Sequence, residues 1–309
     1  MIRALLILAA LLLPGWAAFA KAPTRTPTGH FVDLPAVKST NIAPMHVAIW
    51  LPPRYAAGKK RYGVVYMQDA ENLFFLDKSN FHKVWAADKS VLRLVATKAI
   101  DPVIIVGIYS PKGDRSRTYM PQKLYAALPP ALKVKADAFM AGPNQSDAYL
   151  RFLTGELKPM IDRRYRTLGD PAHTVIAGSS MGALISLYAL AEYPGVFGAA
   201  ACVSTHWPLI DPAEAATFEP ELLTVWQRYL TDRLGPPAGR HLWFDHGDQT
   251  LDRFYGRWQT QIDATLNQIG WRPHQDVETR SYPGAAHEEN AWSARLDDVF
   301  GWLLGPHDD

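Results

Sequence analysis

The sequence predicts an α/β fold in which a mostly parallel central sheet carries helices on both faces. Short apolar runs of five to seven residues alternate along the chain with longer stretches of helical periodicity. Such alternation is typical of parallel sheets that are buried on both faces. The chain has 309 residues, 48% of them hydrophobic, which is enough for one large core.

The expected strands are rich in Val, Ile and Ala, with helical patterns between most of them. The expected strands are residues 46–51, 63–67, 102–107, 173–177, 199–203, 241–246 and 276–282. One helix is expected after Ser146 as its N-cap, another over about 251–269, and a last one over about 289–304.

Residues 1–20 have the features of a secretory signal peptide. Arg3 precedes an apolar run at 4–13, and residues 18–20 form an A-x-A cleavage site. The run is too short to span a bilayer and is followed by Pro14. We therefore expect a periplasmic or secreted protein with no integral membrane span in the mature chain. An uncleaved anchor is the open alternative.

The composition argues against several classes of partner and cofactor. The formal net charge of +2 gives no reason to expect nucleic-acid binding. Cys202 is the only cysteine, so no intramolecular disulfide can form. His241 and His246 lie five positions apart on one expected strand and point to opposite faces, so they cannot share a metal ion. We expect no metal and no cofactor.

The mature chain is expected to form one domain. Residues 21–30 are predicted to be a flexible N-terminal segment, and 31–306 the α/β domain. An insertion at about 112–145 breaks the alternation and carries Arg115 and Arg117. Two interpretations stay open for it: a lid or substrate wall over the site, or an ordinary surface excursion.

A G-x-S-x-G motif occupies residues 178–182 (GSSMG), between an apolar run and a helical run. In this setting it is typical of the nucleophile elbow of the α/β-hydrolase fold. The sharp turn strains Ser180 and turns its hydroxyl away from the sheet. The backbone N–H of Met181 then lies at a helix N-terminus, where it can stabilise an oxyanion. The alternative is a small-residue turn without catalytic function.

The elbow predicts a base and an acid further along the chain, in the order Ser, Asp or Glu, His. Only His287 and His307 follow the last expected strand, and His307 lies in a frayed tail. His287 follows a small-residue loop from which an imidazole can reach Ser180. The alternative for His287 is a loop histidine or a helix cap.

Three aspartates near the end of the strand at 241–246 are candidates for the acid. Asp245 lies inside that strand and is less suited to point past its end. Spacing does not separate Asp248 from Asp252, and Asp248 could instead cap the next helix. The acid would fix the orientation of His287 and stabilise its cationic form.

Five segments carry a resemblance to known enzymes. They are YMQDAENLF at 66–74, AGSSMG at 177–182, STHWP at 204–208, GDQTLD at 247–252 and AHEENAW at 286–292. With these the chain resembles the putative esterase (esterase D-like) family of the α/β-hydrolases, which includes feruloyl and siderophore esterases, S-formylglutathione hydrolases and mycolyltransferases.

The resemblance implies a role for each matching position. Ser180 corresponds to the nucleophile, His287 to the base, and Asp252 is favoured as the acid. The oxyanion donors would be the backbone N–H groups of Met181 and Glu71.

The chain departs from the family pattern at two places. Ala70 replaces the usual glycine of the oxyanion loop, which could distort the loop if a positive φ is needed there. Thr118 stands where relatives tend to carry an acidic residue, so the roles of Arg115 and Arg117 stay open.

His206 and Trp207 follow the strand after the elbow, and either a pocket-lining or a packing role is open for them. The expected function is that of an exported serine hydrolase that cleaves small-molecule or carbohydrate-linked carboxylic esters through an acyl-enzyme. The alternatives are acyl transfer to an alcohol or sugar acceptor, hydrolysis of siderophore lactones, and an inactive binding module.

Overall fold

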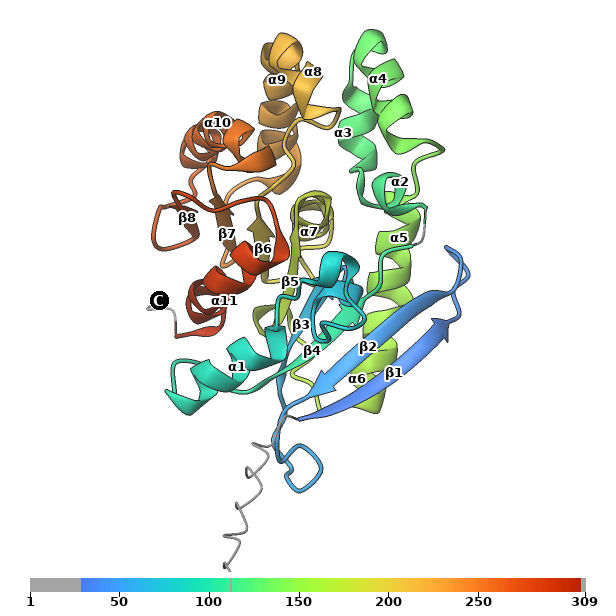
Figure 1. Ribbon diagram of the computed structural model, residues 1–309, viewed down its shortest axis with the longest axis vertical. Helices are drawn as coiled ribbons and strands as arrows, with labels where there is room; N and C mark the ends of the chain where they lie inside the picture. Colours follow the sequence, from blue (N-terminus) through green and yellow to red (C-terminus); the bar gives the residue numbers. More distant parts are fainter. Residues whose placement is uncertain (1–28, 112, 307–309) are drawn as a thin grey trace, which may run out of the picture.

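The computed structural model describes residues 29–111 and 113–306 (Figure 1). The expected signal peptide at residues 1–20, most of the N-terminal segment at 21–30 and the tail at 307–309 lie outside the described residues.

The described chain is built on an eight-stranded sheet with the order β1-β2-β4-β3-β5-β6-β7-β8. All pairs from β4 to β8 are parallel, whereas β1 pairs with β2, and β2 with β4, in antiparallel fashion. The strands are β1 (His30–Val37), β2 (Met45–Leu51), β3 (Gly63–Gln68), β4 (Val103–Ile108), β5 (Thr174–Ser179), β6 (Ala199–Val203), β7 (His241–His246) and β8 (Val277–Ser281).

Helices cover both faces of the sheet, because successive strand side chains point to opposite faces and both faces are apolar. On one face, Val65 and Met67 pack with α1 (Ala87–Ala96) and α11 (Glu289–Leu304). On the other face, Val64 and Tyr66 belong to a larger core with the remaining long helices (Figure 1). These helices are α4 (Pro130–Met140), α5 (Ser146–Phe152), α6 (Lys158–Arg164), α7 (Met181–Glu192), α9 (Glu219–Tyr229) and α10 (Gly256–Gln268).

Short helical turns fill several of the connections. The 3-10 turns are η1 (Ala70–Asn72), η2 (Asn80–His82), η4 (Pro171–His173), η5 (Ala216–Phe218) and η7 (Thr250–Phe254), and the π turns are η3 (Leu153–Leu157) and η6 (Leu230–Leu234). No helix within the described ranges combines the length and the apolar character that a membrane crossing requires.

The predicted fold class is confirmed, and the expected strands lie within about two residues of the observed ones. The exception is β1, which begins at His30, where the flexible segment was expected to end. This edge strand contains Pro35, and its register with β2 shifts between Leu34 and Val37. Proline in a strand is confined to edges and bulges, and here it interrupts the alternation that would have predicted the strand.

The insertion at about 112–145 is helical. It forms α2 (Arg115–Tyr119), α3 (Gln122–Ala127) and α4. Helix α2 packs against α5 and α7, and α3 packs against α9. Figure 1 shows α3 and α4 at the same end of the molecule as α8 (Pro212–Ala215) and α9.

Candidate active site

Ser180 forms the turn between β5 and α7. Its backbone has φ 56° and ψ −120°, a conformation that is strained for a residue with a side chain. Gly178 and Gly182 permit this turn, since a Cβ at position 178 would lie 2.6 Å from the carbonyl carbon of Gly182. The Ser180 N–H donates to the Val203 carbonyl at 2.9 Å, which ties the turn to β6.

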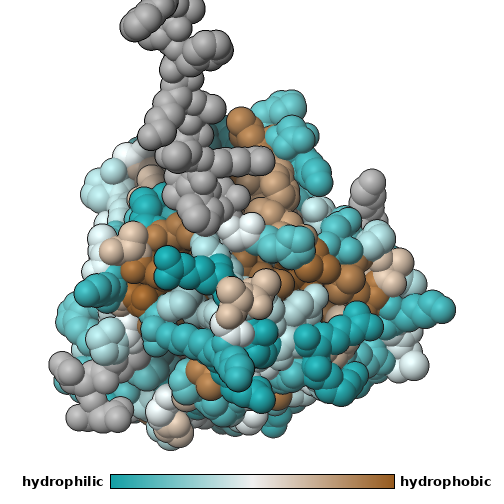
Figure 2. Space-filling view, turned by 90° about the horizontal axis from the view of Figure 1, so that it is seen from below, coloured by the Kyte–Doolittle hydropathy of each residue, from teal (hydrophilic) through white to brown (hydrophobic). Residues whose placement is uncertain are grey.

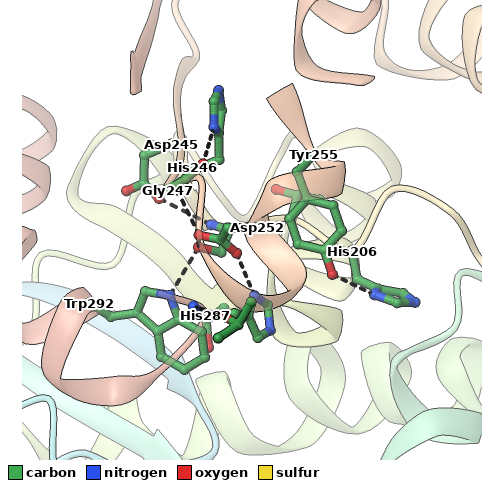
Figure 3. A network of polar contacts seen from close by, with 12 residues as sticks. His206, Asp245, His246, Gly247, Asp252, Tyr255, His287 and Trp292 are labelled. Carbon is green, nitrogen blue, oxygen red and sulfur yellow. Dashed lines mark hydrogen bonds and ion pairs between the residues drawn. The ribbon is translucent and has the colours of Figure 1, made fainter. Parts of the chain in front are cut away.

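His287 lies in the loop after β8 and contacts Asp252 in η7. The distance from His287 Nδ1 to Asp252 Oδ1 is 2.6 Å (Figure 3). The backbone N–H of His287 donates to Thr250 Oγ1 at 2.8 Å, and Gln249 forms an isolated parallel β-bridge with Ala286. The loop after β7 therefore positions both the imidazole and its carboxylate partner.

Asp248, the alternative acid, lies elsewhere in the same loop. It is exposed, and its Oδ1 accepts hydrogen bonds from Gln249 Nε2 and the Gly284 N–H, both at 2.8 Å. These two bonds hold the turn between Asp248 and Gly284. The structure thus brings Asp252, rather than Asp248, to His287.

Asp252 is 1% exposed, and both of its carboxylate oxygens accept hydrogen bonds. Oδ2 accepts from Ser204 Oγ and from the Gly247 N–H, both at 2.7 Å (Figure 3). Burial by itself would raise the pKa of Asp252. The hydrogen bonds and charge of His287, together with the Ser204 and Gly247 donors, instead hold that pKa below its ordinary value.

A buried ion pair lies behind Asp252. Arg295 Nη2 is 2.8 Å from Asp245 Oδ1 and donates to Ser204 Oγ at 2.6 Å. Trp292 Nε1 also donates to Ser204 Oγ, at 3.0 Å. Because two donors occupy the lone pairs of this hydroxyl, its single proton is directed to Asp252 Oδ2. The ion pair therefore fixes the direction of a hydrogen bond to Asp252.

Arg295, Trp292 and Ser204 were not predicted as site residues from the sequence. A signal for Arg295 was present in the last helix. Trp292, Leu296 and Val299 form its apolar face, and position 295 lies on the same face. An arginine there predicts a buried charge that needs an acidic partner.

The predicted oxyanion loop follows β3. Asp69 has left-handed backbone angles of φ 55° and ψ 53°, whereas Ala70 begins η1. A Cβ at Gly107 in β4 would lie 2.9 Å from the Ala70 Cβ, so Gly107 provides the space that the alanine methyl needs. The positive φ is carried by Asp69, and the alanine at position 70 therefore does not strain the loop.

Arg115 of α2 holds this loop through Asp69. Its Nε and Nη2 donate to Asp69 Oδ1 and Oδ2 at 2.7 and 2.8 Å, a bidentate pair. Arg117, in contrast, pairs with Asp114. The carboxyl group of Glu71 accepts hydrogen bonds from the N–H and hydroxyl of Ser110. Burial, with a smaller contribution from Asp69, raises its pKa.

Ser180 and His287 line the same cavity, which has a volume of about 500 Å³. Glu71 and Arg115 line it as well. Within residues 29–111 and 113–306, no group of three or more His, Cys, Asp or Glu side chains is arranged to hold a metal ion.

A larger cavity of about 710 Å³ lies at the amino ends of the strands, next to Gly63, Val103 and Val175. Figure 2 views the molecule from below, where apolar and hydrophilic surface alternate. None of the predicted site residues lines this cavity. Ligands of open α/β sheets bind beyond the carboxyl ends of the strands, so the smaller cavity is the candidate site.

His206 and Trp207 do not line the cavity at Ser180. The Nε2–H of His206 donates to the Ile210 carbonyl at 3.2 Å, and its Nδ1 accepts from the Tyr255 hydroxyl at 2.9 Å (Figure 3). Burial lowers the pKa of His206 to about 3. Trp207 is fully buried and donates to Gln259 Oε1 at 3.2 Å. Both side chains are therefore packed in the interior, and the structure does not place either of them in the lining of this cavity.

The sheet order and the strained serine turn at the carboxyl end of β5 define an α/β-hydrolase. Residues 39–303 match the family described as putative esterase. The chain belongs to this family of ester-hydrolysing enzymes, which confirms the resemblance inferred from the motifs.

Several known proteins are similar to the chain. It is 22% identical over 263 residues to the uncharacterized protein YbbA of Bacillus subtilis (strain 168), covering 83% of this chain and 91% of that protein. A ferulic acid esterase structure has a TM-score of 0.63 at 16% identity, covering 89% of this chain and 98% of that chain.

Two further structures have nearly the same similarity. An IroE-like serine hydrolase from Shewanella oneidensis has a TM-score of 0.61 at 18% identity, covering 89% of this chain and 80% of that chain. The enterobactin esterase FES from Shigella flexneri, in the presence of enterobactin, has a TM-score of 0.60 at 18% identity, covering 95% and 62%. At these identities the structures share the fold with this chain.

Proposed function

We propose that the chain is a serine hydrolase that cleaves carboxylic esters with Ser180 as nucleophile, His287 as base and Asp252 as acid. The observation that carries the proposal is the 2.6 Å contact between His287 Nδ1 and Asp252 Oδ1, beside a cavity that also contains the strained Ser180. The strained turn has a cost in stability. We explain this cost by the need to present the Ser180 hydroxyl to a substrate.

In the proposed reaction His287 accepts the proton of Ser180 as the serine oxygen attacks the ester carbonyl. The backbone N–H groups of Met181 and Glu71 stabilise the oxyanion. His287 then donates the proton to the departing alcohol, which leaves an acyl group on Ser180. Water, activated by His287, releases the acid. Asp252 holds the imidazole by Nδ1 and stabilises its cationic form.

Substitution of the nucleophile tests the proposal. We expect Ser180→Ala to lower kcat for p-nitrophenyl acetate by roughly 10⁴–10⁶-fold and to abolish labelling by a fluorophosphonate probe. Ser39→Ala is a matched control, since Ser39 lies in the β1–β2 connection, does not line the cavity at Ser180, and bonds there to the N–H groups of Asn41 and Ile42 and to the Glu156 carboxylate. Wild-type turnover by the Ser180→Ala protein would end the proposal. Product analysis with an added alcohol distinguishes hydrolysis from acyl transfer.

We also propose that the protein is exported and acts on small-molecule esters outside the cytoplasm. The support is the signal-peptide pattern of residues 1–20. Expression of the full chain in a Gram-negative host should place in the periplasm a protein whose first residue is Lys21. A cytoplasmic protein that retains Met1 would contradict export and leave the chemistry untouched.

A further inference from the structure

The wall of the cavity at Ser180 has two parts, and aromatic side chains line only one of them. One part is polar and lies next to the oxyanion loop: Glu71 bonded to Ser110, and Arg115 bonded to Asp69. The other part lies next to His287. It contains the aromatic side chains of Phe81, Trp85 and Trp292, together with the charged side chains of Lys83, Glu288 and Glu289.

Contacts place the aromatic part beside the base. The rings of His287 and Trp292 are 5.0 Å apart, and those of Trp292 and Trp85 are 5.5 Å apart. Ser293 Oγ also donates to the Trp85 carbonyl at 2.8 Å. The segment that carries Phe81 and Trp85 therefore packs on the segment that carries His287.

Phe81 is unusual in two respects. It is 80% exposed although it is a large aromatic residue, and its backbone has φ 63° and ψ 12°. His82 and Ala86 also have positive φ values, of 50° and 53°. Left-handed geometry is a genuine outlier for a bulky side chain and is maintained only where the surroundings impose it.

The surroundings of Phe81 do impose its position. The Asn80 N–H donates to Asn72 Oδ1 at 2.9 Å, and Asn72 Nδ2 donates to Glu289 Oε1 at 3.2 Å. Lys83 pairs with Glu288, the neighbour of His287. These bonds on both sides of Phe81 fix the backbone that carries the ring, at a cost in strain and in exposed apolar surface.

The direction of the proposed reaction assigns the two parts of the cavity. His287 returns its proton to the alcohol oxygen, so the alcohol half of the ester must lie on the His287 side. The acyl half of the ester must then lie in the polar part of the cavity, next to Glu71 and Arg115.

We propose that Phe81, which lines the same cavity as Trp85 and Trp292, forms a subsite for an apolar alcohol half of aromatic size. This inference rests on the proposed function and names the class of substrate: esters in which a bulky apolar alcohol is joined to a small or polar acyl group.

The test varies the alcohol at a fixed acetyl group. For the wild type we compare kcat/KM for benzyl acetate with that for ethyl acetate, and we define selectivity as the ratio of the two. Phe81→Gly removes the ring and accepts a φ of 63° without strain. We expect its selectivity to fall about tenfold, because apolar contacts of this size discriminate by that order. Phe81→Leu should keep part of the selectivity.

Leu76→Ala is the matched control. Leu76 is 53% exposed in the same connection but does not line the cavity, so selectivity should stay at the wild-type value. Unchanged selectivity in both Phe81 variants would overturn the inference. A second series compares ethyl esters of small and of aromatic acids, and so varies the acyl half instead of the alcohol half. If the Phe81 variants lost selectivity only in this second series, the inference would also be overturned. An active Ser180→Ala enzyme would overturn the proposed function itself, so the two failures are distinguishable.

Discussion

Asp252 is the carboxylate that contacts the imidazole of His287, and in the proposed mechanism it orients that ring. It accepts from His287, Ser204 and Gly247, and an asparagine amide cannot accept at both of its terminal atoms. We expect Asp252→Asn to place a donor against His287 and stabilise the wrong tautomer. The expected loss in kcat is about 10⁴-fold.

The matched variant is Asp248→Asn, because Asp248 is exposed and accepts from Gln249 and from the backbone of Gly284 rather than from His287. We expect its kcat for p-nitrophenyl acetate to stay within about twofold of the wild type, as is usual for exposed positions. Equal losses in the two variants would show that the contact between Asp252 and His287 has no role in turnover.

The sequence could not decide between these two aspartates, because both follow β7 within six residues. Their difference arises from η7, which turns Asp252 inward while Asp248 bonds to the loop after β8. Ser204 was beyond prediction for a similar reason. Its role depends on donors from α11 that are 88 and 91 positions away along the chain.

At the scale of elements, the junction between β5 and α7 has little tolerance for added volume. A Cβ at position 178 would clash with the backbone of Gly182 at 2.6 Å. We therefore expect Gly178→Ala to lower the free energy of unfolding by about 1–3 kcal/mol, the usual cost of overpacking, and to reduce turnover by displacing Ser180.

Gly155→Ala is the opposite case for comparison. Gly155 is exposed in η3, and no atom lies within 4 Å of its added Cβ. Replacement of glycine within a helix should raise the free energy of unfolding by about 0.5–1 kcal/mol. Urea titrations of both variants measure the difference, and a Gly178→Ala protein as stable as Gly155→Ala would contradict the packing argument.

Elements with strong local patterns were predictable, and those that depend on tertiary context were not. The buried parallel strands were visible as apolar runs, and the GSSMG turn between two of them identified the elbow. Strand β1 was hidden by Pro35. The helices of the insertion were hidden by its prolines, although Pro130 stands at a helix start, where proline is tolerated.

For the molecule as a whole, His206 links stability to pH. Its pKa is lowered by burial, and by the charge of His287, to about 3, against an ordinary value of 6.5. Between these values the unfolded chain binds a proton at this position and the folded chain does not. Stability is therefore fully present above about pH 6.5 and is lost as the pH falls toward 3, at about 1.4 kcal/mol per pH unit.

Urea unfolding at pH 5 and at pH 7 measures this dependence. His206→Gln removes the titrating group, so the variant should lose less stability than the wild type between the two values. For each protein we take the change in the free energy of unfolding between pH 5 and pH 7. A general destabilisation of the variant lowers both of its values equally and cancels in this difference. A variant with the full wild-type pH dependence would exclude His206 as its source.

Cys202 lies inside the sheet on β6, without exposed surface, and burial raises the pKa of its thiol well above the ordinary value. Sulfur chemistry requires an accessible thiolate, and this side chain offers neither access nor charge. This thiol should therefore stay reduced and unpaired in the folded protein, both in a reducing cytosol and in an oxidising extracytoplasmic space.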